Sequence, residues 1–132
     1  MGRLRIERMN RVFFSFGALF ALLSVAAGAF GAHWLKNQLD VQSLEIFQTA
    51  ARYQMYHALA LLVLGWVTMT SENRLLPWAG WCFTAGILIF SGSLYGLSLS
   101  GVKILGAVAP LGGLSLMAGW GILLTYGLTQ KA

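Results

Sequence analysis

Four stretches of the sequence contain no charged side chain, and their lengths suit helices that cross a lipid bilayer. They cover about residues 12–32, 53–71, 77–99 and 104–128. An α-helix rises 1.5 Å per residue, so the 21 residues of the first stretch can cross a hydrocarbon core of about 30 Å. The second stretch is the shortest and begins with the polar residues Gln54 and His57, but residues 58–64 at its centre are wholly apolar. The pattern predicts four transmembrane helices.

The first stretch has an alternative interpretation as a cleaved signal peptide. It follows an arginine-rich start and contains the small residues Ala27 and Ala29 near its end. Its apolar run is longer than the ~7–15 residues usual for such peptides, and the three later spans need a first helix to orient them. We therefore expect it to be retained.

The connections between the stretches differ in length. Two are short turns, which favour antiparallel neighbouring helices. Residues 33–52 form a longer loop, in which Asp40 or Ser43 can cap a helix whose apolar face carries Leu44, Phe47 and Ala51. This helix either lies on the membrane surface or extends the second span. The expected fold is an all-α membrane protein: a four-helix transmembrane up-down bundle with a short amphipathic helix in the first outer loop.

Composition supports a membrane protein. Of the 132 residues, 58% are hydrophobic and 10% are charged, whereas soluble domains average about 25% charged residues. The chain is long enough for a single integral membrane domain, residues 1–132. The single cysteine, Cys82, cannot form an intrachain disulfide or a thiolate metal cluster. The basic residues before the first span suit anionic lipid headgroups better than nucleic acid, so the lipid bilayer is the expected partner and nucleic acid is not.

The distribution of lysine and arginine predicts the orientation. Four spans place the N-terminus, the second connection and the C-terminus on one side, which holds Arg3, Arg5, Arg8, Arg11, Arg74 and Lys131. The other side holds Lys36, Arg52 and Lys103. Since cytoplasmic loops carry the excess of basic residues, we expect a multi-pass protein of the plasma (inner) membrane with both termini in the cytoplasm.

Small residues recur inside the spans. They form four-residue steps, as helix–helix contacts in membranes do: Ser24, Gly28 and Ala32 in the first span, Gly92, Gly96 and Ser100 in the third, and Ser115 and Gly119 in the fourth. Pro110 in the fourth span removes a backbone hydrogen bond, which predicts a kink or local unwinding.

Several motifs together resemble a known family. They are GAFGAH at 28–33, YQMYHALA at 53–60, FSGSLY at 90–95, and PLGG at 110–113 with AGW at 118–120. In this order they resemble the uncharacterised four-helix inner-membrane family that includes the bacterial YgdD and YwdK proteins (domain of unknown function 423), over roughly residues 12–126. The resemblance implies an integral plasma-membrane protein of four helices and brings no established activity or cofactor.

The unusual polar residues all fall toward the outer side. We expect them to form a small outward-facing polar pocket, because polar groups at membrane depth tend to face the interior or a cavity; its members are His33, Gln54, His57, Ser91, Ser93, Tyr95 and Pro110. Each also has a structural explanation, such as a serine bonding back to its own helix. His33 and His57 are the candidate ligands for a haem iron or a divalent metal.

The sequence does not identify a reaction. It lacks a phosphate loop, a dinucleotide fingerprint and a nucleophile elbow, so we do not expect an enzyme. A structural or accessory role, with a second copy or another membrane protein as partner, is the favoured hypothesis. The alternatives are a small transporter or channel subunit acting as an oligomer, and a haem- or metal-binding protein that uses the two histidines.

Overall fold

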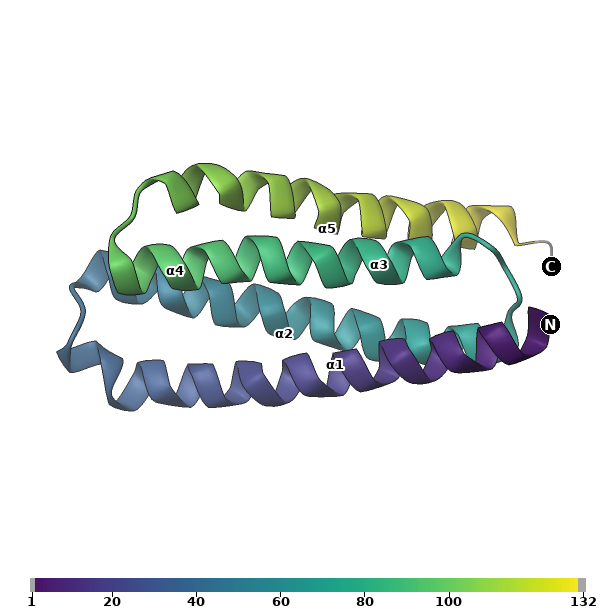
Figure 1. Cartoon of the computed structure of the whole chain (residues 1–132), viewed down its shortest axis with the longest axis horizontal. Coiled ribbons are helices and arrows are strands. Elements are labelled where there is room, and N and C mark those ends of the chain that lie inside the picture. Colours follow the sequence, from purple (N-terminus) through teal and green to yellow (C-terminus); the bar gives the residue numbers. More distant parts are fainter. Residues whose placement is uncertain (1, 131–132) are drawn as a thin grey trace.

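The chain folds into long helices joined by short connections (Figure 1). The computed structural model describes the backbone of residues 2–130 and the side chains of residues 7–130; Lys131 and the side chains of Arg3 and Arg5 lie outside this part. The elements are α1 (Gly2–His33), the 3-10 turn η1 (Leu35–Asn37), α2 (Val41–Thr70), α3 (Leu76–Gly86), the π-helix η2 (Ile87–Ser91), α4 (Gly92–Ser100) and α5 (Ile104–Thr129). The described residues contain no strand, so the prediction of an all-α protein is confirmed.

The ends of the helices follow from local chemistry. The Asp40 side chain accepts hydrogen bonds from the backbone N–H and the hydroxyl of Ser43, at 2.9 and 2.8 Å, and so caps α2. These bonds lower the pKa of the Asp40 carboxyl below its ordinary value. Pro77 lies in the first turn of α3, where its missing N–H removes no helical bond. Gly101 ends α4 at a φ of 71°, a left-handed conformation that glycine adopts without steric cost.

The four helical rods lie side by side and alternate in direction, with both chain ends at one end of the molecule (Figure 1). Helix α1 packs along α2, and α5 packs along the rod formed by α3, η2 and α4. These two hairpins meet where α2 contacts α3, η2 and α4. Helices α1 and α5 share no extensive contact. The helices therefore form an open row in which α2 and the α3–α4 rod are central.

Three segments are long and apolar enough to cross a membrane: Glu7–Asn37, Leu76–Ser100 and Ile104–Thr129. They correspond to the first, third and fourth predicted spans. Helix α2, which contains the second predicted span, does not meet the same measure. Its apolar residues share the helix with Gln54, His57 and Thr68, which are buried against other helices.

The prediction of a separate amphipathic helix in the first loop is wrong. Its residues form the first turns of α2, which runs without a break from Val41 to Thr70. The segment contains no helix-breaking residue, and its apolar face continues the buried face of α2: Phe47, Ala50 and Ala51 are buried, as is Gln54 one turn later. The alternative, a helical extension of the second span, is the observed structure.

Of the kink or local unwinding predicted at Pro110, the local unwinding does not occur, since α5 remains helical through this residue. Pro110 lies in the second turn of α5 with its side chain exposed. The irregular backbone occurs instead in the facing rod, as the π-helix η2, which packs against α5.

Close packing depends on glycines that only partly match the predicted small-residue steps. A side chain on Gly112 would overlap the backbone of Phe90, and one on Gly119 would come within 2.7 Å of the Phe83 ring. Gly28 and Gly92, predicted as contact residues, face open space. The main apolar core lies toward the end that carries the termini, and it includes Phe13, Leu61, Leu64, Leu76, Phe83, Ile87 and Leu116.

Candidate functional site

Several buried polar side chains form hydrogen bonds between helices, and most of these bonds involve α2. Others, such as Thr84 and Ser98, bond to carbonyls of their own helices. From α1, the Ser24 hydroxyl donates to the Ala51 carbonyl at 2.7 Å. In the opposite direction, the Gln54 amide Nε2 donates to the Phe20 carbonyl of α1 at 2.8 Å. Helical carbonyls keep a second lone pair for such bonds. These two bonds hold α1 against α2.

A second pair of bonds joins α2 to the neighbouring rod. The hydroxyl of Ser91, the last residue of η2, donates to the Ala50 carbonyl at 2.8 Å. The Tyr95 hydroxyl of α4 donates to Gln54 Oε1 at 2.8 Å. Ser24 and Ser91 thus bind the carbonyls of adjacent residues of α2 from two different helices.

His57 is held through both of its ring nitrogens. Nε2 lies 3.0 Å from Trp120 Nε1, and Nδ1 lies 2.7 Å from the Tyr53 carbonyl oxygen. Because an indole N–H can only donate, Nε2 must be the acceptor and Nδ1 must carry the proton. The imidazole is therefore neutral in this arrangement, and it packs against Phe83 and Trp120. A metal ion at either nitrogen would have to displace a hydrogen bond.

The structure brings together some of the predicted pocket residues and separates others. Gln54, Ser91 and Tyr95 are linked through α2, and Ser93 is buried nearby in α4. His57 lies deeper along α2, in the separate contact with Trp120. Pro110 is exposed on α5, apart from this network.

The structure places the two candidate metal ligands, His33 and His57, apart from each other. His33 is exposed at the end of α1, two residues after Gly31, which lies beside Phe47. His57 follows Phe47 by ten positions, or about 15 Å along the helix. Among residues 7–130, no group of three or more His, Cys, Asp or Glu side chains is close enough to hold a metal ion.

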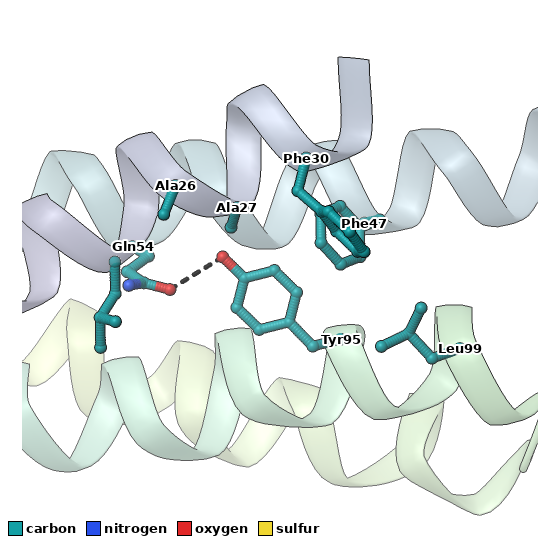
Figure 2. A pocket seen from close by; sticks show the side chains of 8 residues that line it. Ala26, Ala27, Phe30, Phe47, Gln54, Tyr95 and Leu99 are labelled. Atoms are coloured by element: carbon teal, nitrogen blue, oxygen red, sulfur yellow. Dashed lines mark hydrogen bonds between the residues drawn. The ribbon is translucent and has the colours of Figure 1, made fainter. Parts of the chain in front are cut away.

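Beside this network, a groove of about 580 Å³ opens between α1 and α4, with α2 as its floor (Figure 2). Its lining residues are Leu23, Ala26, Ala27 and Phe30 from α1, Phe47 and Gln54 from α2, and Tyr95 and Leu99 from α4. Figure 2 shows the Tyr95 side chain reaching across the groove toward Gln54, with the Phe30 and Phe47 rings on the side of Tyr95 away from Gln54. The Tyr95 ring also contacts the Phe47 ring, with centroids 4.9 Å apart.

A second cavity of about 550 Å³ surrounds the His57–Trp120 pair, between α2 and α5. Tyr53, Tyr56, Phe90 and Met117 are among its lining residues. Each cavity thus contains a pair of side chains bonded between helices: Gln54 and Tyr95 in the groove, His57 and Trp120 in the second cavity.

Sequence reasoning missed several of these residues. Trp120 belongs to the AGW motif, but the motif does not show that it bonds to His57. Ser24 and Ser115 belong to the predicted small-residue steps, which do not show that Ser24 donates to Ala51 or that Ser115 donates to the Cys82 carbonyl at 2.7 Å. Among residues 7–130, the only fully buried side-chain oxygen or nitrogen without a partner is Asn10 Oδ1.

Comparison with known proteins gives consistent matches. The family model described as "Protein of unknown function (DUF423)" matches residues 27–113. A UPF0382 membrane protein of Staphylococcus epidermidis is 47% identical over 113 residues, which are 86% of this chain and 92% of the relative. The UPF0382 membrane protein YwdK of Bacillus subtilis is 44% identical over 111 residues, 83% of this chain and 90% of the relative. No solved structure matches the chain significantly.

Proposed function

The chain belongs to the DUF423 family of uncharacterised membrane proteins, as its motifs predicted, and on this premise we propose that it is a structural or accessory component of the plasma membrane. It acts by binding a hydrophobic membrane component in the groove between α1 and α4. It does not catalyse a reaction or conduct a solute.

The proposal includes four membrane crossings with both termini in the cytoplasm. Helix α2 is the fourth span: its 30 residues would extend about 45 Å, and its buried side chains Gln54 and His57 bond to neighbouring helices instead of facing lipid. Arg8 and Arg11 belong to the first turns of α1, and Arg74 belongs to the turn between α2 and α3. With Arg3, Arg5 and Lys131, the sequence assigns six basic residues to the side that carries the termini against three on the other, which favours a cytoplasmic location for it.

The observation that carries the proposal is the contrast between the groove and the polar network beside it. The groove is open and lined mainly by apolar side chains. The polar atoms at its inner end, those of Gln54 and Tyr95, bond to each other and to α1. Polar side chains that tie helices together are a known means of stabilising membrane proteins. The network therefore suits a rigid support for a hydrophobic binding surface.

The same contacts weaken the alternatives. A transporter was suggested by a break at Pro110 and by an outer polar cluster, but α5 is continuous and the cluster is bonded between helices. A haem or metal site was suggested by His33 and His57, which lie well apart along the molecule. No contact in the described structure favours a transporter or a metal site over the accessory role.

Site-specific photocrosslinking in native membranes tests the proposal. A photoreactive phenylalanine analogue replaces Leu99, which lines the groove, or Leu114, an exposed leucine of α5 outside the described cavities. We expect the Leu99 position to give adducts of one defined species. The Leu114 position should give a mixture that follows the bulk lipid composition. If both positions give that same mixture, the groove is not a binding surface and the proposal fails.

A further inference from the structure

We propose that the groove between α1 and α4 holds one acyl chain of a zwitterionic phospholipid from the leaflet opposite the termini. This inference rests on the proposed function, because it names the hydrophobic component that the groove binds. With both termini in the cytoplasm, that leaflet is the outer one.

The shape of the groove favours an acyl chain over a partner helix. Toward the termini α1 approaches α3, where the Phe13 and Phe16 rings lie 5.4 and 6.4 Å from the Trp81 ring. Farther from the termini, α1 and α4 separate and the groove opens between them. The groove is therefore a wedge that is closed at its inner end.

The length of the wedge fits within one leaflet. It extends along α1 from Leu23 to Phe30, which is about 10 Å at 1.5 Å per residue. One leaflet supplies about half of the ~30 Å hydrocarbon thickness. A membrane-spanning helix, about 10–12 Å wide with its side chains, would meet the closed end of the wedge partway across. An acyl chain that enters from the near interface can end there.

The surface of the groove suits an apolar occupant. Apart from Gln54 and Tyr95 its lining residues are apolar, and no lining residue is charged. Its volume of about 580 Å³ lies within the ~300–1,000 Å³ typical of small-molecule sites. Ala26 and Ala27 leave the space on the α1 wall, so a larger side chain at either position would occupy it.

Charges at the open end suit a headgroup that carries both signs. The two wall helices lead to exposed lysines: Lys36 follows α1 and Lys103 follows α4. The floor helix is preceded by the exposed acidic residue Asp40. A phosphate has lysine partners there and an ammonium group has a carboxylate partner, whereas a purely anionic headgroup would also meet that carboxylate.

Lipid retention after reconstitution tests the inference. The full chain is reconstituted in vesicles of equal parts phosphatidylethanolamine and phosphatidylglycerol, extracted in mild detergent and weighed intact by native mass spectrometry. We expect the unmodified protein to retain one phosphatidylethanolamine. Ala27→Phe fills the groove and should lower that occupancy about tenfold, the equivalent of ~1.4 kcal/mol. Ala118→Phe, at an exposed alanine of α5, should leave it unchanged.

A second groove variant controls for the possibility that Ala27→Phe lowers retention by misfolding. Leu99→Trp narrows the groove from the α4 wall at an exposed position and should also lower retention, while both variants keep the helical content and melting temperature of the parent. Equal retention by the parent and both groove variants overturns the inference, and so does preferential retention of phosphatidylglycerol. If no lipid is retained but crosslinking at Leu99 still captures one defined species, the lipid assignment fails and the accessory function stands. If neither lipid nor a defined crosslink is found, both fail.

Discussion

The indole N–H of Trp120 on α5 donates to Nε2 of His57 on α2 at 3.0 Å. The backbones of these two helices do not pack closely, because the α3–α4 rod lies between them. The bond therefore joins the two hairpins beside Phe83. The Phe83 ring centroid lies 5.1 Å from that of Trp120 and 5.7 Å from that of His57. It also fixes the proton of His57 on Nδ1, since Nε2 has to accept.

Replacing Trp120 by phenylalanine should destabilise the protein. The Trp120→Phe variant keeps an aromatic ring against Phe83 but leaves the buried Nε2 of His57 without its donor. Interhelical hydrogen bonds in membrane proteins contribute about 0.6 kcal/mol on average and up to ~1.7, so we expect a loss in this range. The free energy of unfolding in detergent, followed by far-ultraviolet circular dichroism, measures it.

Trp66→Phe is the matched control, because Trp66 is exposed on α2. It should change the free energy of unfolding much less than Trp120→Phe. Equal effects of the two substitutions would mean that loss of indole surface, and not loss of the His57 bond, explains the change.

The Ser91→Ala substitution should loosen the contact between η2 and α2. The Ser91 side chain is fully buried and its hydroxyl donates to the Ala50 carbonyl. Its removal should cost about 0.6 kcal/mol, by the same average. Ser15→Ala is the control, since Ser15 is exposed on α1. A double-mutant cycle of Ser91→Ala and Ser24→Ala shows whether the two bonds to adjacent carbonyls of α2 are coupled. If the two losses of stability are additive, the bonds act independently.

Gly112→Ala should separate α5 from the α3–α4 rod. The added methyl group would overlap the Phe90 backbone, which cannot turn away as a flexible side chain can. Overpacking of this kind typically costs about 1–3 kcal/mol. At Gly121 the same change meets no atom within 4 Å, and it should leave stability unchanged or slightly raised, because alanine favours helices over glycine. A Gly112→Ala protein as stable as Gly121→Ala would contradict the observed packing of α5.

The sequence predicts where the helices lie along the chain better than it predicts which helices contact one another. Uncharged stretches locate α1, α5 and the α3–α4 rod because the hydrocarbon core requires about 20 apolar residues per crossing. The limits of the helices are less well predicted: α1 begins at Gly2 and α2 at Val41, well before the uncharged stretches begin. A helix can continue beyond the hydrocarbon core, because its backbone hydrogen bonds also form in the interface. The first charged residue indicates only where the hydrocarbon core ends.

The site is predicted less well, for a related reason. In a soluble protein the apolar stripe of a helix shows which face is buried, but in lipid both faces are apolar and the stripe disappears. The sequence therefore placed Gln54, Ser91 and Tyr95 at a similar depth but could not show that Ser91 meets Ala50 or that Tyr95 meets Gln54. The π-helix η2, which ends at Ser91, has no recognisable signal in the residues Ile87–Ser91.

The proposed orientation leads to a prediction for labelling in intact cells. In a Cys82→Ser background, Lys36→Cys lies just after α1, at the end opposite the termini, and Glu72→Cys lies in the exposed turn between α2 and α3. Since basic residues concentrate toward the end that carries the termini, a membrane-impermeant maleimide should label Lys36→Cys directly and Glu72→Cys only after permeabilisation. Labelling in the opposite order would place the termini outside. The groove would then open in the cytoplasmic leaflet, and any phospholipid that it holds would come from that side.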